Sequence, residues 1–195
     1  VIAPFFAPSF QGYEQEDFPA SIANLPVQPA GWAFSIWSVI YLCLLAHAGF
    51  GLLRRRESAR WDHVRLPLIA SLGLGVFWLE TASRAPVLAT LQIWAMAGFA
   101  VVAMLRVPRC GHPLLRIPVS LYAGWVISAS IVGAGVVACG YGAIPDLVAV
   151  IGVVLLASVV LAIVAVAQPS SAFVVAALWA LFGIMAKAVG ANENF

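Results

Sequence analysis

Residues Gln28 to Tyr41 read QPAGWAFSIWSVIY, in which a polar, proline-punctuated segment runs straight into an apolar one. Pro26 and Pro29 disfavour helix in the residues that precede them, and Gly31 adds a flexible joint. From Trp32 to Leu53 the sequence is apolar, and this length is sufficient to cross a bilayer. The stretch therefore predicts a loop in water that leads directly into a membrane-spanning helix.

The composition of the whole chain indicates the same class of protein. Of its 195 residues, 63% are hydrophobic and only 9% are charged, whereas a soluble domain carries roughly a quarter charged residues. The net charge of +2 gives no reason to expect nucleic-acid binding, because the basic residues are concentrated in two loops. Cys43, Cys110 and Cys139 are widely spaced and match no metal-binding or redox motif. We therefore expect a membrane protein surrounded by lipid and without a metal site.

Six apolar stretches are each long enough to form a helix across the hydrocarbon core, and short breaks separate them. They are Trp32–Leu53, Leu66–Ser83, Pro86–Leu105, Ile117–Cys139, Pro145–Gln168 and Ser171–Gly190. A helix satisfies its backbone hydrogen bonds within one segment, as a lipid environment requires. The predicted fold class is all-α, a polytopic transmembrane helix bundle with six spans in this chain.

The N-terminal part differs in character from the bundle. Residues 1–10 are apolar but too short and too rich in proline to span, so we expect them to end a seventh span that begins before Val1. Residues 11–29 are polar and should lie in water, either as a functional lid or as a plain connector. We therefore divide the chain into an outer segment, residues 1–31, and a transmembrane bundle, residues 32–195.

The basic residues predict the orientation of the bundle. The loop over residues 54–65 holds five arginines and the loop over residues 106–116 holds three, and Arg84 and Lys187 are the other two basic residues. With six spans the two loops fall on one side, which the positive-inside rule places in the cytoplasm. We expect a multi-pass protein of a bacterial inner membrane. The arginines could also hold anionic lipid headgroups, although control of topology explains them.

Few residues inside the spans could do chemistry. His47 is the only histidine at membrane depth, so a haem held by two histidines is not expected, and a hydrogen-bonded interior histidine is. Glu80 and Arg84 are spaced for an ion pair on one helix face. The sequence contains no serine–histidine–acid set, no paired carboxylates at depth and no phosphate loop. An enzyme is therefore not indicated, and no cofactor is required.

The aromatic residues of the first span allow two interpretations. Trp32, Phe34, Trp37 and Tyr41 all lie in its first half, and the spacing of four places Trp37 and Tyr41 on one helix face. Such rings form an aromatic belt at the boundary between water and lipid in many membrane proteins. Alternatively, some of them line a pocket under the preceding loop.

Four stretches together resemble one known family. The run PAGWAFSIWSVIY is similar to the signature of the TspO/MBR family, the tryptophan-rich sensory proteins related to the mitochondrial translocator protein (peripheral benzodiazepine receptor). Phe77-Trp78, the fourth-span run IPVSLYAGWVISASI and the last-span run ALWALFGIMAK agree in order and spacing. The resemblance covers the chain from about Pro29 onward and suggests a long form with extra C-terminal helices. It also implies that the first helix of the family precedes Val1.

The resemblance implies a ligand-binding pocket. Relatives bind tetrapyrroles, steroids and hydrophobic drugs within the bundle, under the loop between the first two helices. Carried over by position, the expected pocket residues are Trp32, Phe34, Trp37, Tyr41, Trp78, Tyr122 and Trp125. Where relatives often have asparagine in two of the spans, this chain has Gly75 and Gly133, so two polar anchors for a porphyrin are missing.

Two functions of different kinds follow. The first is a membrane sensor or regulator, for example of photosynthesis genes, that binds a porphyrin, haem or other hydrophobic small molecule. The second is an accessory structural subunit of a larger photosynthetic or respiratory membrane complex. Small residues spaced four apart, such as Ala129 and Gly133, are compatible with close helix packing and with a homodimer. A small transporter is a weaker alternative, because no charged residue lies near a midplane.

Overall fold

The computed structural model describes Tyr13, Phe18, Pro19 and residues 28–192 of the chain. In these residues the secondary structure is helical throughout, with turns between the helices. A short 3-10 helix, η3, precedes six long α-helices. Their bounds are η3 Gly31–Ser35, α1 Ile36–Arg54, α2 Ala59–Arg84, α3 Pro86–Leu105, α4 Pro113–Gly140, α5 Asp146–Ala167 and α6 Ser171–Asn192.

All six long helices have the length and composition needed to cross a membrane, which confirms the predicted all-α bundle of six spans. Two helices begin earlier than the hydropathy indicated: α2 at Ala59 rather than Leu66, and α4 at Pro113 rather than Ile117. The first turn of α2 carries Arg60 and Asp62, and that of α4 carries Arg116. Hydropathy indicates which residues lie within the membrane and does not show where the helix begins. In α4, His112 caps the helix by accepting a hydrogen bond from the Leu114 amide at 3.2 Å.

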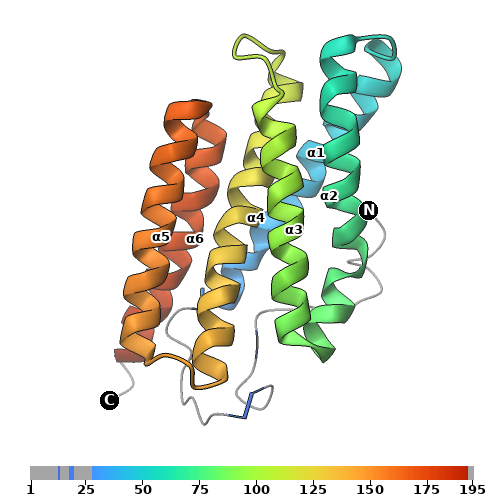
Figure 1. Ribbon diagram of the computed structural model, residues 1–195. Coiled ribbons are helices and arrows are strands. Elements are labelled where there is room, and N and C mark those ends of the chain that lie inside the picture. Colours follow the sequence, from blue (N-terminus) through green and yellow to red (C-terminus); the bar gives the residue numbers. More distant parts are fainter. Residues whose placement is uncertain (1–12, 14–17, 20–27, 193–195) are drawn as a thin grey trace.

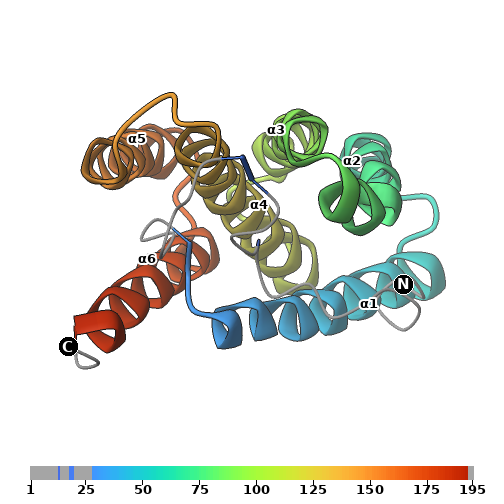
Figure 2. The same ribbon diagram turned by 90° about the horizontal axis from the view of Figure 1, so that it is seen from below.

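Helix α4 lies at the centre of the bundle. It contacts α1, α3, α5 and α6, while α2 packs mainly on α3. Figure 2 shows this arrangement along the helix axes, with α4 between α1 and α6 on one side and α3 on the other. Every residue from Pro118 to Ser128 is buried, and Tyr122 and Trp125 are the largest fully buried side chains.

Hydrogen bonds between helices join the polar side chains of the interior. The Ser71 hydroxyl of α2 donates to the Met96 carbonyl of α3 at 2.7 Å, and it accepts from the Tyr122 hydroxyl of α4 at 2.7 Å. Gln92 of α3 donates to the Leu74 carbonyl of α2 at 2.8 Å. Because lipid offers no alternative partners, such bonds hold the helices in register.

Two polar predictions within the spans are confirmed. His47 is buried, its Nδ1 lies 2.9 Å from the Leu114 carbonyl oxygen, and its ring stacks on Trp61. It is thus a hydrogen-bonded interior histidine that links α1 to the start of α4. Glu80 and Arg84 form the expected ion pair on the surface of α2.

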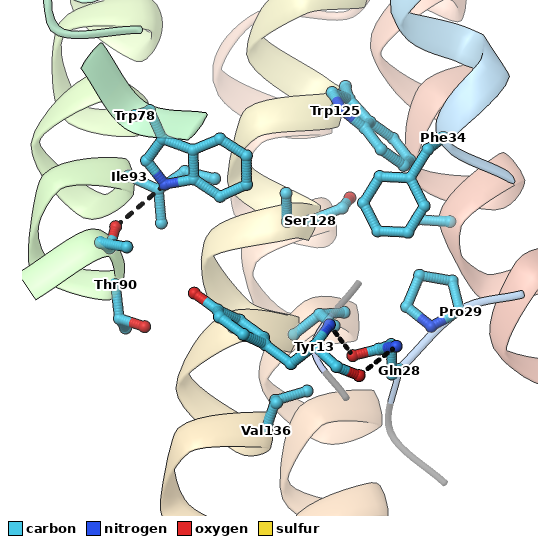
Figure 3. Close-up of a pocket in the computed structure, with 15 residues that line it drawn as sticks. Tyr13, Gln28, Pro29, Phe34, Trp78, Thr90, Ile93, Trp125, Ser128 and Val136 are labelled. Carbon is cyan, nitrogen blue, oxygen red and sulfur yellow. Dashed lines mark hydrogen bonds between the residues drawn. The ribbon is translucent and has the colours of Figure 1, made fainter. Parts of the chain in front are cut away.

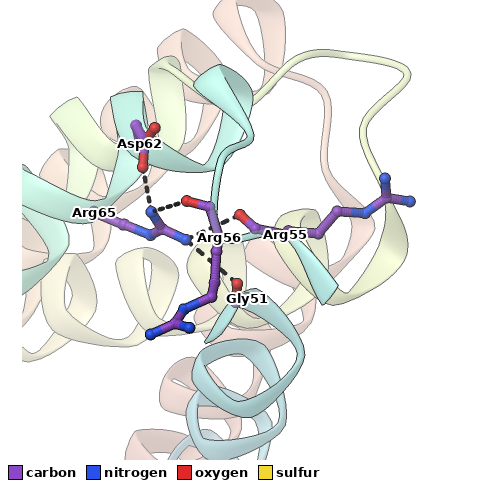
Figure 4. Close-up of polar contacts among 5 residues, drawn as sticks. All are labelled: Gly51, Arg55, Arg56, Asp62 and Arg65. Atoms are coloured by element: carbon purple, nitrogen blue, oxygen red, sulfur yellow. Dashed lines mark hydrogen bonds and ion pairs between the residues drawn. The ribbon is translucent and has the colours of Figure 1, made fainter. Parts of the chain in front are cut away.

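The loops that carry most of the arginines lie at one end of the bundle, as the sequence predicted (Figure 1). At this end, Arg65 of α2 caps the end of α1. Its guanidinium donates to the carbonyls of Gly51 at 3.3 Å and of Arg55 and Arg56 at 3.0 Å, and it pairs with Asp62 (Figure 4). Carbonyls at a helix C-terminus lack partners within the helix, and a cation also complements the helix dipole.

Helix α4 approaches the backbone of α6 closely at Gly124. A Cβ placed on Gly124 would lie 2.6 Å from the Phe173 carbonyl oxygen and 3.0 Å from the Ala176 Cβ. The absence of a side chain at this position therefore sets the separation of the two helices.

We expect Gly124→Ala to destabilise the protein by about 1–3 kcal/mol, because backbone atoms of α6 must move to admit the methyl group. The matched control is Gly98→Ala in α3, where an added Cβ meets nothing within 4 Å. Thermal unfolding of both variants in the same detergent provides the measurement. Equal melting temperatures would show that the α4–α6 contact does not limit stability.

Candidate functional site

A pocket opens at the end of the bundle opposite the arginine-rich loops. It lies between η3, the end of α2, the start of α3 and the second half of α4, and Ala180 of α6 completes it. The space between these elements is about 550 Å³, a figure that includes its open mouth. Figure 3 shows Trp78 on one side of it and Phe34 and Trp125 on the other.

The aromatic walls are held in place by their own contacts. The Trp78 indole N–H donates to the Ala89 carbonyl at 3.1 Å, which fixes the ring against α3. Phe34 and Trp125 meet edge to face, with ring centroids 6.1 Å apart and an interplanar angle of 87°. Aromatic rings in this geometry attract each other beyond their area of contact. The pocket therefore has firm, flat apolar walls.

Tyr13 and Gln28, which precede η3, form a hydrogen-bonded cap on the pocket. Tyr13 and Gln28 exchange two hydrogen bonds: the Tyr13 amide donates to Gln28 Oε1 at 2.9 Å, and Gln28 Nε2 donates to the Tyr13 carbonyl at 3.2 Å. Both residues line the pocket (Figure 3). The next residues are fixed to α6, because the Ala30 amide donates to the Gly183 carbonyl at 3.0 Å. The lid or connector predicted for residues 11–29 falls largely outside the described residues, but its two described ends lie on the pocket.

The lining offers few polar groups to a ligand. The hydroxyls of Thr90 and Ser128 donate to carbonyls of their own helices, each at 2.9 Å. The Trp125 Nε1 is buried and has no acceptor among the described residues. Trp125 lies at the end of the pocket away from the Tyr13–Gln28 pair (Figure 3). Among the described lining residues none is charged and none is histidine. The arrangement suits a neutral hydrophobic molecule with one hydrogen-bond acceptor.

The seven residues predicted for the site fall into two groups. Phe34, Trp78 and Trp125 line the pocket. The other four, Trp32, Trp37, Tyr41 and Tyr122, do not line it. The difference between Trp32 and Phe34 arises in η3, because a 3-10 helix turns by a third of a revolution per residue and points the two rings in different directions. A role for any of the seven in ligand binding stays a prediction.

The four remaining aromatic residues have other surroundings. Trp32 is 45% exposed and packs on Trp179 and Phe182 of α6, as a ring at the edge of the bundle would. Trp37 stacks on Tyr41 at 5.3 Å and meets Trp125 edge to face at 6.2 Å, so it supports the pocket wall from behind.

Several lining residues carry no signal of their own in the sequence. Small and aliphatic side chains of α3 and α4 make up most of the pocket surface, among them Thr90, Ile93, Ser128, Val132 and Val136. The last three are spaced four apart and follow Trp125 along one face of α4. That spacing, read from Trp125 as an anchor, is the signal that could have identified them. Trp179 was also missed; its indole N–H donates to the Ala33 carbonyl at 2.8 Å and anchors η3.

Of the two glycines noted in the sequence, only Gly133 belongs to the pocket. A Cβ added there would meet only Thr90 Oγ1, at an ordinary distance of 3.7 Å. Gly75 faces Met96 instead, whose Cε would lie 3.0 Å from an added Cβ.

We expect Tyr122→Phe to lower the free energy of unfolding by about 1 kcal/mol, because the variant loses the hydrogen bond to Ser71 and keeps the ring. Pocket residues should be unaffected. Tyr41→Phe is the control, since the Tyr41 hydroxyl has no hydrogen-bond partner among the described residues. Denaturant unfolding in detergent compares the two variants with the parent protein. A larger loss for Tyr41→Phe would contradict the structural role assigned to Tyr122.

Comparison with known proteins gives one match. The sequence profile of a protein family described as TSPO-like protein matches residues 5–194, which is nearly the whole chain. No match is found among curated proteins or among solved structures.

Proposed function

The chain belongs to the TSPO-like protein family, and from this membership we propose that it is a membrane sensor or regulator that binds a neutral hydrophobic small molecule. The proposed site is the pocket between Phe34, Trp78 and Trp125. The observation that carries the proposal is an apolar, aromatic-walled space under a hydrogen-bonded cap. The role is binding rather than catalysis. Its setting is a bacterial inner membrane, with the arginine-rich loops in the cytoplasm.

The chemistry of the lining narrows the ligand class. A porphyrin with ionised carboxylates needs cationic partners, because a buried charge without a partner is costly. The described lining has none, and no imidazole is available there as a haem ligand. His47 bonds to Leu114 at the other end of the bundle. Neutral flat molecules such as steroids therefore match the pocket better than an anionic tetrapyrrole.

The cap offers a route from binding to signalling. A ligand in the pocket lies beneath Tyr13 and Gln28, which connect the N-terminal segment to the start of the bundle. Because Ala30 is bonded to α6 and Trp179 of α6 is bonded to Ala33, a shift of the cap is coupled to η3 and α6. Occupancy of the pocket would then change the outer surface, where a partner protein could respond.

We expect Gly133→Leu to fill the pocket and to weaken ligand binding at least about tenfold, because overpacking an occupied site costs 1–3 kcal/mol. The fold should be retained, since a Cβ at this position has room. Gly98→Leu in α3 is the control, because its added side chain enters open space outside the pocket.

The measurement is a titration of a fluorescent steroid and an uncharged porphin into the protein in phosphatidylcholine nanodiscs. Micromolar binding of either probe that is lost in Gly133→Leu and kept in Gly98→Leu supports the proposal. Binding of neither probe, or equal loss in both variants, overturns it. A gentle extraction that yields only a large particle with other subunits would favour an accessory role instead.

We also expect Trp125→Phe to discriminate between ligands. The variant keeps an aromatic wall but loses the unpartnered Nε1 donor. A steroid with a ketone should bind roughly fivefold more weakly, which corresponds to one hydrogen bond of about 1 kcal/mol. The parent hydrocarbon should bind equally well to both proteins. Equal effects on ketone and hydrocarbon would show that Trp125 acts by shape alone.

A further inference from the structure

A second cavity lies at the arginine-rich end of the bundle, far from the aromatic pocket. It forms where the loop after α1 meets the first turn of α2 and the turn before α4. Its space is about 770 Å³ including its open mouth. Arg55, Arg60 and His112 line it together with Trp61.

The two arginines of the cavity differ from four other arginines at this end of the bundle. Arg65, Arg106, Arg109 and Arg116 each donate to main-chain carbonyls and thereby serve the fold. Among the described residues, Arg55 and Arg60 have neither a hydrogen-bond acceptor nor a carboxylate partner for their side chains. Asp62 is already paired with Arg65. The positive charge that faces the cavity is therefore not neutralised within the described part of the chain.

The N-terminus of α2 and the cap residue of α4 add donors to the same cavity. The first amides of α2 have no partner within the helix, and the Ser58 side chain does not cap them. At the start of α4, His112 Nδ1 accepts the Leu114 amide, so the hydrogen of the neutral ring is on Nε2. The partial positive charge of both helix ends favours an anion here.

Aromatic contacts give the cavity a firm floor. Trp61 is 3% exposed and stacks on His47 with ring centroids 5.3 Å apart. Phe50 stacks on His112 at 4.6 Å, and the Arg55 guanidinium lies 5.9 Å above the Phe50 ring. The Trp61 Nε1 faces Gly51 and adds no donor to the cavity. The donors are thus arranged over a surface that does not need to rearrange on binding.

We propose that this cavity binds a phosphate group, carried either by an anionic lipid headgroup or by a soluble phosphorylated molecule. The donors come from three chain segments: the guanidinium groups of Arg55 and Arg60, the first amides of α2 and the imidazole N–H of His112. Together they match the several acceptor oxygens of a phosphate. Control of membrane topology requires positive charge in this loop but no cavity, so it does not account for the arrangement.

The test uses the whole protein in phosphatidylcholine nanodiscs and compares Arg60→Gln and Arg55→Gln with Arg56→Gln. Arg56 is in the same loop and does not line the cavity; its side chain extends away from that of Arg55 (Figure 4). All three variants remove one charge from an exposed position, so folding should be unaffected. Calorimetric titration with phenyl phosphate examines a soluble ligand, and native mass spectrometry after reconstitution with phosphatidylglycerol examines a lipid.

We expect each cavity variant to weaken binding about tenfold, as loss of a charge-assisted hydrogen bond would, while Arg56→Gln remains within about twofold of the parent. If phenyl phosphate binds and the three variants differ in this way, the ligand is a soluble phosphorylated molecule. If phosphatidylglycerol is retained and the variants differ in the same way, the ligand is a lipid headgroup. The proposal is overturned if neither probe binds, or if Arg56→Gln weakens binding as much as Arg60→Gln. The latter result would mean that only the net charge of the loop matters.

Discussion

The burial of α4 is the constraint on which the rest of the structure depends. Every residue from Pro118 to Ser128 is covered, so the helices around α4 must match its surface. At Gly124 the match is a direct contact with the backbone of α6, and at Tyr122 it is a hydrogen bond to Ser71 of α2. A membrane offers no hydrophobic force between helices, and close packing and buried hydrogen bonds take its place. Both kinds of interaction are found on α4.

The same helix also connects two sites of opposite chemistry. Its middle carries Trp125, Ser128 and Val132, which line an apolar pocket with no charge among its described lining residues. Its first turn begins at a cavity with two unpaired arginines, where its N-terminal end is capped by His112. The helix dipole is positive at this end and adds to the positive charge of the arginines, so both favour an anion there. The same asymmetry of charge thus separates the two ligand classes that we propose for the two ends.

Much of the fold was accessible from the sequence, because hydropathy and helix length are local properties. The six spans and the Glu80–Arg84 pair follow from hydropathy and spacing within single helices, and the interior place of His47 follows from its depth in the first span. The start of α2 was predicted seven residues late, because charged turns at a membrane boundary look like loop. The different orientations of the Trp32 and Phe34 rings also could not be predicted from the sequence. They depend on the five-residue 3-10 helix, which in turn is fixed by Trp179, a residue 146 positions away from its acceptor Ala33.

Gly133 affects which kind of ligand the proposed site would accept. The structure gives ordinary space to a side chain at this position, with only Thr90 nearby, so glycine is not required by packing. An asparagine there would place an amide in the pocket, which would serve as an anchor for a polar ligand and would also occupy volume. Glycine removes the anchor and leaves the volume empty. With the hydroxyls of Thr90 and Ser128 bonded within their own helices, the space that remains is apolar, and its aromatic walls then select for shape and hydrophobic area.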